Sequence, residues 1–394
     1  MSKTPNNRNL PIQVMHILSG DLWGGAEAQT LLLCINQDEF DENYVSSVLI
    51  FNEGFVERKF RSAGVETFVV PEGKGFLLLL LKSCRIIKSQ NNLQKIDLMI
   101  AHGYKESIVA FILSRFSGVP WILQVHGMTE LYSGIKKLKS SIYKFTQFSL
   151  AKLSAKRIIF VSRNLKNALG FNTCKKSLVI LNAALTPNNT RDTPILKEEN
   201  PNLNNIKFIW IGRMVDVKRP DLLLSGFKLL HDDPSVSARF QYSLTLAGDG
   251  PLLSSIKDFS KSVNTENINF TGFVSDTSYL YNNQPVLVLT SDSEGIPTII
   301  LEACHAKCPI ITRKVGGIEE IFEILYEYPV RFLNTDSPEE LKNALIEFSS
   351  SIGSLRKRAE ASDTSYFLPG RLRSQHYQIY KSIIFDEENP NLSN

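Results

Sequence analysis

IQVMHIL at residues 12–18, SGDLWGG at 19–25 and AEAQTLLLCIN at 26–36 are consecutive segments that together indicate the fold of this chain. The first is rich in apolar and β-branched residues, as expected of a buried strand, and the second is a glycine-rich loop. The third has the apolar spacing of a helix. A strand, a glycine loop and a helix in this order are typical of α/β folds with a parallel sheet.

The same alternation continues through the first half of the chain. Further apolar runs predict strands at residues 44–50, 67–70, 98–101, 121–125 and 157–161. Residues 77–90 and 107–116, which lie between them, have the length and period of helices. We therefore expect one parallel sheet with helices on both faces.

Beyond this half, the polar residues 186–205 contain little that could be buried, and the alternation then restarts. Strands are predicted at 206–211, 242–247, 268–270, 286–290 and 309–312, and helices at 221–230, 252–261 and 338–349. A chain of 394 residues also exceeds what one hydrophobic core usually serves.

These patterns predict two α/β domains. We place the first at residues 1–190, a linker at 191–205 and the second at 206–370. In 371–394 we expect a helix that crosses back to the first domain, followed by a frayed tail.

Composition narrows the class of protein. The 44 basic and 40 acidic side chains give a net charge of only +4, which does not indicate nucleic acid as a partner. Five cysteines show no paired framework and leave an odd one over, which favours a reducing cytosol. Residues 1–10 lack the apolar core of a signal peptide, and no apolar run approaches the roughly 20 residues that span a bilayer. We therefore expect a cytoplasmic protein.

The most informative segment for function is SDSEGIPTIILEA at residues 291–303, which carries Glu294 and Glu302. Pro297 suits the first turn of a helix. The amides of Thr298 and Ile299 would then be unpaired at a positive helix end, ready for an anion such as a diphosphate. Glu302, a turn or two later, is placed to accept hydrogen bonds from a sugar or ribose hydroxyl. The segment therefore predicts a nucleotide-sugar site.

Two loops of the second half add to this prediction. Gly212 and Arg213 follow a strand, and Lys218 comes shortly afterwards, so that two cations lie at the carboxyl edge of a sheet, where ligands bind in open α/β folds. Gly248, also after a strand, would let the backbone approach a ligand. Taken alone, Arg213 and Lys218 are better explained as solvated surface cations, and Gly248 is explained equally well by a tight turn.

With these segments, GDGP at 248–251, TGFV at 271–274 and VGGI at 315–318 occur in an order that resembles the retaining glycosyltransferases of family 4. The resemblance covers about residues 14–384. It implies the GT-B architecture, in which two Rossmann-like domains with parallel sheets face each other across a cleft. It also implies transfer of a hexose-type sugar from a nucleoside diphosphate sugar, linked to UDP or GDP, to a hydroxyl acceptor with retention at the anomeric carbon.

The resemblance assigns roles to single residues of the second half. Arg213 and Lys218 match positions that bind the donor diphosphate, Glu302 matches the position that holds the nucleotide ribose, and Glu294 lies beside the transferred sugar. The backbone after Glu294 is expected to meet sugar hydroxyls and phosphates, and Val274 to lie near the base. The expected donor-contacting residues of this half are Arg213, Lys218, Gly248, Val274, Glu294, Gly295, Ile296, Thr298, Ile299 and Glu302.

The first half supports the resemblance through other residues. Gly24 and Gly25 match the family's glycine loop, which lies over the donor sugar and phosphates. His102 and His126 each follow a strand, and His126 matches a position that contacts the donor sugar. The expected catalytic residues are thus Glu294, His126, Arg213 and Lys218. The chain departs from the family at 180–184, where ILNAA replaces the usual Asn-Gly, so we expect a different hinge turn.

We expect no metal and no other cofactor. Cys304 and Cys308 lie on one predicted helix face with His305 between them, but the segment lacks further ligands, so core packing explains them better. No Asp-x-Asp pair follows a strand in a way that suggests a divalent ion bound to the diphosphate.

Residues 135–157 alternate lysines with apolar and aromatic residues at helical spacing. A basic amphipathic helix of this kind can rest on an anionic membrane leaflet, here the inner face of the plasma membrane. A helix that packs its apolar face on the sheet explains the pattern equally well. Lipid-linked acceptors are common in related enzymes, so the acceptor is predicted to be a lipid-linked or growing surface glycan, as in polysaccharide or lipopolysaccharide assembly.

Two other functions fit the same pocket. A nucleotide-sugar isomerase or epimerase of similar shape would convert the nucleotide sugar without an acceptor. A noncatalytic nucleotide-sugar-binding protein would have the same fold but catalyse no reaction. The combination of Arg213, Lys218, Glu294 and Glu302 argues against the latter. Base, sugar, acceptor and linkage depend on many loops, so the sequence does not specify them.

Overall fold

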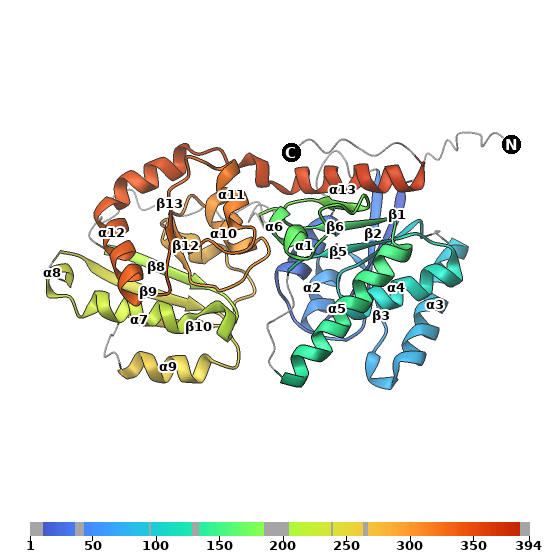
Figure 1. Ribbon diagram of the computed structural model, residues 1–394, viewed down its shortest axis with the longest axis horizontal. Helices are drawn as coiled ribbons and strands as arrows, with labels where there is room; N and C mark the ends of the chain where they lie inside the picture. The colour runs from blue at the N-terminus through green and yellow to red at the C-terminus, as the bar shows by residue number, and fades with distance from the viewer. Residues whose placement is uncertain are drawn as a thin grey trace. The chain divides into compact units, whose positions relative to one another are not determined.

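The computed structural model describes residues 11–35, 43–93, 96–127, 134–184, 205–237, 239–262 and 267–386. The chain forms two compact units (Figure 1). Unit 1 consists of Met1–Ala183 and Leu368–Asn394, and unit 2 of Ala184–Phe367. Most of the segment predicted to be a linker, and the last eight residues, predicted to be a frayed tail, lie outside the described residues.

Unit 1 is built on a parallel sheet of seven strands in the order β3-β2-β1-β4-β5-β6-β7. The strands are β1 (Ile12–Leu18), β2 (Tyr44–Ile50), β3 (Glu66–Val69), β4 (Leu98–Ala101), β5 (Trp121–Val125), β6 (Arg157–Phe160) and β7 (Ser177–Val179). The central strands β4 and β5 are buried along their whole length, which explains their uninterrupted apolar sequences.

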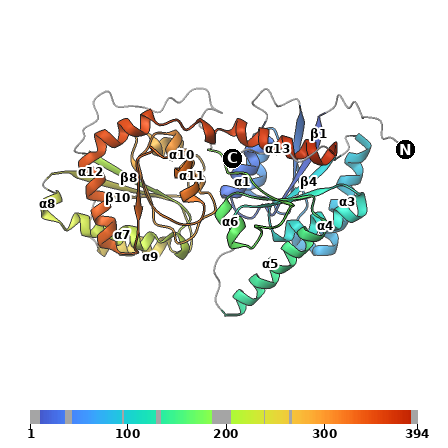
Figure 2. The same cartoon turned by 45° about the horizontal axis from the view of Figure 1, so that its top comes forward.

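Helices cover both faces of this sheet. They are α1 (Gly25–Cys34), α2 (Phe55–Ser62), η1 (Glu72–Lys74), α3 (Phe76–Leu93), α4 (Tyr104–Ser117), α5 (Gly134–Ser154), α6 (Arg163–Ala168) and α13 (Pro369–Ile384). Helices α3, α4 and α5 lie side by side on one face, and α1 packs with α13 on the other (Figures 1 and 2).

Unit 2 contains a parallel sheet of six strands in the order β10-β9-β8-β11-β12-β13. Its strands are β8 (Asn205–Ile211), β9 (Gln241–Ala247), β10 (Ile268–Gly272), β11 (Val286–Leu289), β12 (Ile310–Arg313) and β13 (Val330–Leu333). The helices are η3 (Asp216–Lys218), α7 (Pro220–His231), α8 (Pro234–Ser237), α9 (Leu253–Ser262), η4 (Ser278–Tyr281), α10 (Thr298–His305), α11 (Ile318–Ile324), α12 (Pro338–Ala361) and η5 (Ser365–Phe367). Trp210 and the apolar faces of α7 and α12 form the centre of its core.

The last helix, α13, belongs to unit 1 although it follows unit 2 in the sequence. The Arg373 guanidinium donates to the carbonyl oxygen of Leu32 at 3.1 Å, and Arg371 donates to that of Leu181 at 2.7 Å. His376, fully buried, hydrogen-bonds to the Gln124 side chain in β5 at 3.3 Å. Side chains of α13 thus replace solvent as partners for carbonyl groups of unit 1.

The sequence-based prediction places most strands within a residue or two of their observed ends, but it misses two. β7 and β13 lie at the outer edges of the two sheets, and most of their residues are half-buried. Neither strand has the continuous apolar run that marks the central ones, whereas the edge strand β3 was predicted from the run at 67–70. The helix expected at 338–349 continues to Ala361, because buried apolar residues recur at helical spacing along α12.

Candidate active site

The sheet of unit 2 reverses its strand order between β8 and β11, which are neighbours although β9 and β10 lie between them in the sequence. Loops that leave adjacent parallel strands on either side of such a point diverge and form a crevice at the carboxyl ends. The loop after β8 carries Arg213 and Lys218, and the loop after β11 carries Glu294. Strand order therefore brings together residues that lie 76 or more positions apart.

Lys218 and Glu294 form a direct ion pair at this point of the sheet. The Lys218 Nζ donates to Glu294 Oε1 at 2.6 Å, and the Glu294 side chain is only 8% exposed, against 24% for Lys218. The Thr290 hydroxyl supports the loop by hydrogen bonding to the carbonyl oxygens of Lys218 and Arg219, at 3.0 and 2.8 Å. The two residues predicted to hold different parts of one donor thus contact each other.

Two glycines fix the backbone around this pair. A Cβ at Gly316, which has a φ of +59°, would lie 1.9 Å from the carbonyl oxygen of Glu294. The Gly317 amide donates to the carbonyl oxygen of Gly295 at 2.7 Å. The turn after β12 therefore packs directly on the backbone of the glutamate loop, and only glycine leaves room for it.

At Gly248 the close neighbour is protein rather than ligand. Its φ is +145°, and a Cβ would lie 1.8 Å from the carbonyl oxygen of Gly212. The Met214 amide donates to the carbonyl oxygen of Asp249 at 2.8 Å. Gly248 thus locks the loop after β9 onto the loop that carries Arg213, and a donor contact of Gly248 stays a prediction.

Helix α10 begins beside the glutamate loop. Pro297 is its N-cap, with extended backbone angles, and Thr298 is the first helical residue, so the prediction that Pro297 lies in the first turn was wrong by one position. The Ile300 amide bonds to the carbonyl oxygen of Pro297 at 3.1 Å. Helix geometry leaves the amides of Thr298 and Ile299 without an intrahelical acceptor, as expected of an anion-binding end.

Glu302 lies further along α10 and is 5% exposed. Its Oε2 accepts hydrogen bonds from the Thr277 hydroxyl at 2.8 Å and from the Tyr281 hydroxyl at 2.9 Å. Burial raises the pKa of Glu302 above its ordinary value, while these two donors oppose the rise. Both bonds end on Oε2, so Oε1 is the oxygen that they leave for a hydroxyl such as that of a ribose.

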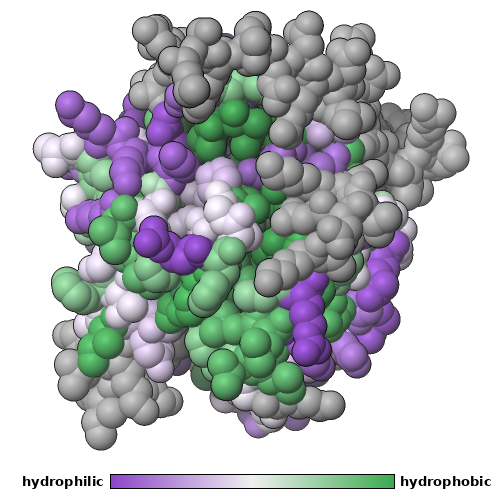
Figure 3. Space-filling model, turned by 90° about the vertical axis from the view of Figure 1, so that its right-hand side faces the viewer, coloured by the Kyte–Doolittle hydropathy of each residue, from purple (hydrophilic) through white to green (hydrophobic). Residues whose placement is uncertain are grey.

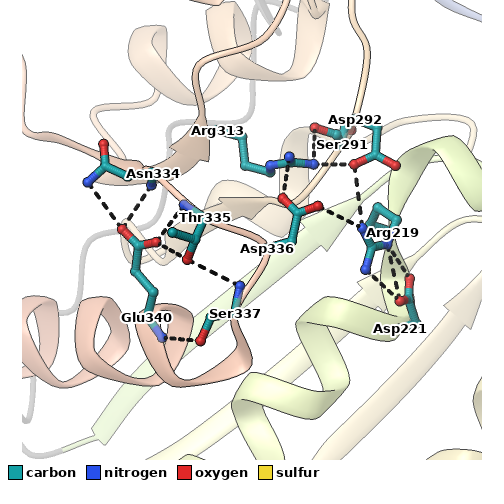
Figure 4. A network of polar contacts seen from close by, with 10 residues as sticks. All are labelled: Arg219, Asp221, Ser291, Asp292, Arg313, Asn334, Thr335, Asp336, Ser337 and Glu340. Atoms are coloured by element: carbon teal, nitrogen blue, oxygen red, sulfur yellow. Dashed lines mark hydrogen bonds and ion pairs between the residues drawn. The ribbon is translucent and has the colours of Figure 1, made fainter.

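An ionic network ties the neighbouring loops together (Figure 4). Arg219, next to Lys218, pairs with Asp221 at 3.0 Å and with Asp292 and Asp336 at 3.5 Å. Arg313, at the end of β12, pairs with the same Asp292 and Asp336. The network joins the loops after β8, β11 and β13, so it fixes the backbone on both sides of the Lys218–Glu294 pair.

The remaining expected donor contacts of unit 2 differ in exposure. Arg213 is exposed directly after β8, and Val274 is half-buried beside the exposed Phe273. The Ile296 side chain is 4% exposed, so only its backbone is available to a ligand. Gly295 is half-buried, and its carbonyl accepts the bond from Gly317.

In unit 1 the expected residues lie at the carboxyl edge of the other sheet. Gly24 is the N-cap of α1, where its amide donates to Glu27 Oε2 at 3.0 Å, and Gly25 is the first helical residue. His126 directly follows β5, and its Nε2 lies 2.8 Å from Nδ1 of His102. Burial lowers the pKa of His126 to about 4, so the ring is neutral at physiological pH.

Sequence analysis missed three buried polar residues of unit 1. His16 in β1 and Thr30 in α1 both hydrogen-bond to His102 and are fully buried. Glu106, on the first turn of α4, is 6% exposed, and burial raises its pKa to about 7. His16 and Thr30 lie within largely apolar segments, where only their contacts with His102 reveal them.

Cys304 and Cys308 are buried, as core packing requires, but the prediction that both lie on one helix face was wrong, because α10 ends at His305. Among the residues that the structure describes, no group of three or more His, Cys, Asp or Glu side chains is arranged to hold a metal ion. Metal independence stays a prediction. Within the same residues, no helix is both long and apolar enough to cross a membrane.

Comparison with known proteins links this geometry to a family. The family model described as glycosyl transferases group 1 matches residues 192–363. The O-antigen biosynthesis glycosyltransferase WbnH of Escherichia coli is 31% identical over 278 residues, which are 69% of this chain and 73% of WbnH. The E. coli UDP-Gal:alpha-D-GlcNAc-diphosphoundecaprenol alpha-1,3-galactosyltransferase is 24% identical over 78% of this chain and 79% of its own.

Among solved structures, that of Anabaena HepE in complex with UDP and glucose superposes with a TM-score of 0.72 at 18% identity. The match covers 94% of this chain and 100% of HepE. Likeness at this level of identity concerns the fold, and it confirms the GT-B fold with two Rossmann-like α/β domains.

Proposed function

The chain belongs to the glycosyl transferases group 1 family and is a glycosyltransferase, and we propose that it moves a hexose-type sugar from a nucleoside diphosphate sugar to a hydroxyl acceptor with retention at the anomeric carbon. We place it with the family 4 enzymes. The donor is expected to carry uridine or guanosine diphosphate, and no metal or other cofactor is required.

The observation that carries the proposal is the Lys218–Glu294 pair at the point of strand reversal, next to the start of α10. A cation, a carboxylate and a positive helix end meet there within one unit. A diphosphate needs positive partners, and a sugar needs a hydrogen-bond acceptor for its hydroxyls. One nucleotide sugar offers both groups at adjacent positions.

In the proposed reaction, charge develops on the leaving diphosphate as the bond to the anomeric carbon breaks. Arg213, Lys218 and the amides of Thr298 and Ile299 stabilise that charge, an electrostatic effect that usually dominates such catalysis. The leaving phosphate takes the proton of the acceptor hydroxyl on the same face of the sugar, so no protein nucleophile is needed. Glu294 orients the sugar, and Glu302 orients the ribose.

The acceptor is proposed to be a lipid-linked or growing surface glycan. Two relatives, the E. coli galactosyltransferase and an N-acetyl-D-galactosaminyltransferase of Campylobacter jejuni, are named for sugar transfer to glycans on diphosphoundecaprenol or PP-undecaprenol, and WbnH is named as an O-antigen biosynthesis enzyme. Such acceptors lie at a membrane, so an enzyme that uses them gains from contact with the lipid surface.

A surface on unit 1 fits this contact. Helices α3, α4 and α5 expose large apolar side chains, among them Leu77 at 71%, Phe116 at 75% and Phe145 at 75%. The others are Phe76, Leu81, Ile142, Tyr143 and Leu153. Figure 3, which views the molecule from this end, shows hydrophobic side chains gathered together with hydrophilic ones beside them.

Charge on these helices favours an anionic lipid surface over other partners. Their sequences contain ten lysine and arginine residues, of which Lys105 pairs with Glu72 at 2.9 Å, and one acidic residue, Glu106, which is buried. Each basic residue near an anionic leaflet contributes about 1 kcal/mol. The side chains of residues 135–140, which are part of the predicted basic helix, lie outside the described part of the chain. The exposed residues of α3 and α4 extend the proposed membrane-contacting surface beyond that helix.

Vesicle flotation tests this contact. Binding is expected to vesicles that contain anionic phospholipid, and to fall as salt is raised. Phe145→Ser should weaken it about tenfold, because burying a Phe side chain contributes about 1.5–3 kcal/mol. The matched control is Tyr326→Ser, since Tyr326 is 80% exposed but lies in unit 2. Equal binding to neutral vesicles, or equal loss in both variants, would contradict the proposal.

The enzymatic function is tested with purified protein and a panel of uridine and guanosine diphosphate sugars, with released nucleotide as the readout. Release that requires a hydroxyl acceptor supports a transferase, whereas an altered nucleotide sugar without acceptor indicates an isomerase or epimerase. Binding without turnover would indicate a noncatalytic protein. Unchanged transfer by both Arg213→Ala and Glu294→Ala would refute the site assignment.

A further inference from the structure

Three histidines of unit 1, the fully buried His16 and the half-buried His102 and His126, form an unbroken chain of hydrogen bonds. Nδ1 of His16 lies 2.9 Å from Nε2 of His102, and Nδ1 of His102 lies 2.8 Å from Nε2 of His126. The rings stack at centroid distances of 5.2 and 5.1 Å. They come from β1 and from the ends of β4 and β5, which are neighbours in the sheet. Ser46 in β2 closes one end, with Oγ 3.4 Å from Nε2 of His16.

Burial keeps these rings neutral, because it lowers the pKa of His16 to about 3 and that of His126 to about 4. A neutral imidazole has one nitrogen that donates and one that accepts, and the bond made by one nitrogen fixes the role of the other. The protons of the chain can therefore all point toward His126 or all point toward Ser46. Nδ1 of His126 carries a proton only in the first arrangement.

Thr30 selects between the two arrangements. Its hydroxyl donates to the carbonyl oxygen of Ala26 at 2.9 Å, so toward His102, 3.3 Å away, the same oxygen can only accept. Nδ1 of His102 must then carry the proton, which it shares between Thr30 and Nε2 of His126. Nε2 of His126 is consequently an acceptor, and the proton of His126 lies on Nδ1.

Nδ1 of His126 is buried and has no hydrogen-bond partner among the described residues. A buried donor without a partner is unfavourable, so its presence indicates a group that binds there. Resting on the proposed function, we infer that Thr30 and His102 are positioning residues, which hold His126 in the Nδ1–H tautomer so that it donates a hydrogen bond to an oxygen of a sugar substrate bound at unit 1.

The tautomer can be observed directly. Long-range ¹⁵N–¹H correlation spectra of the full chain with labelled histidine distinguish Nδ1–H from Nε2–H, and His126→Gln assigns the signal of His126. We expect Nδ1–H in the unchanged protein. Thr30→Val keeps the shape but removes the oxygen, so Nε2–H should become populated, whereas Thr30→Ser should retain Nδ1–H.

Kinetics provide the second readout. Thr30→Val is expected to lower kcat/KM for sugar transfer about tenfold, the effect of one lost hydrogen bond of about 1.4 kcal/mol, and Thr30→Ser should stay near the unchanged enzyme. Nε2–H in the unchanged protein, or a tautomer that Thr30→Val does not alter, would overturn the inference. An altered tautomer with unchanged kcat/KM would overturn its catalytic part. If no sugar is transferred at all, the proposed function fails, while the spectra still decide the tautomer.

Discussion

Replacing Gly316 with alanine tests how the glutamate loop is held in place. The new Cβ would lie 1.9 Å from the carbonyl oxygen of Glu294, about 1 Å closer than Cβ atoms approach in folded proteins. The turn after β12 and the glutamate loop must therefore separate. Separation breaks the 2.7 Å bond from the Gly317 amide to the carbonyl oxygen of Gly295 and moves the backbone that carries Glu294.

Three contributions set the size of the effect. A left-handed backbone costs alanine about 1 kcal/mol, the lost hydrogen bond about 1 kcal/mol, and the overlap about 1–3 kcal/mol. The free energy of unfolding should therefore fall by about 3–5 kcal/mol. In a unit of this size each kcal/mol lowers the melting temperature by about 2–4 °C, which predicts a shift of about 10 °C.

Gly272→Ala is the matched control for stability, because it lies in the same unit with a φ of +70° and no atom within 4 Å of the new Cβ. It should pay only the backbone cost and shift melting by about 3 °C. Thermal melting of both variants is the assay, and the donor KM of Gly316→Ala should also rise at least about tenfold. Equal melting shifts for the two variants would refute the reasoning, because the contact with Glu294 would then cost nothing.

Three further predictions follow from single contacts. Lys218→Met should abolish most sugar transfer and lower the free energy of unfolding by about 2 kcal/mol, because it leaves the Glu294 carboxylate unpaired. Adding Glu294→Gln should restore stability but not activity, and a double variant as unstable as the single one would contradict this. Glu302→Gln keeps the shape of the side chain but accepts hydroxyls more weakly, so the donor KM should rise about tenfold with little change in melting, and an unchanged KM would remove Glu302 from the ribose site. Burial lowers the pKa of His126 and His376 to about 4, so the unfolded chain binds more protons than the folded chain below pH 6.5. The contribution of these histidines to the stability of unit 1 should be fully present above that pH and fall by up to about 3 kcal/mol per histidine as the pH drops toward 4. Urea unfolding that is independent of pH in this window would contradict the prediction.

The fold was largely predictable because its central strands are buried on both faces. Such strands read as continuous apolar runs, as at Leu98–Ala101 and Trp121–Val125, and parallel strands joined by helices permit few topologies. The edge strands β7 and β13 pack less apolar surface, so their sequences carry little signal. Glycine loops and the helix start near Pro297 were visible because they depend on local backbone requirements.

The candidate site was predictable only in part. Sequence spacing identified Lys218 and Glu294 separately, but their contact depends on β8 lying next to β11. Gly248 was interpreted as room for a ligand, whereas the room is taken by the carbonyl of Gly212. The link from Thr30 through His102 to His126 crosses three elements, and no periodicity within one segment reports such a link.

The central claim is that this chain transfers a sugar with retention from a nucleoside diphosphate donor held by Lys218, Glu294 and the start of α10. The most direct measurement incubates the purified full chain with nucleotide sugars and a diphosphoundecaprenol-linked sugar acceptor, and follows product and nucleotide by NMR. The account predicts one nucleoside diphosphate released for each sugar transferred, and a product with the anomeric configuration of the donor. A product of inverted configuration, or a changed nucleotide sugar formed without acceptor, would contradict it.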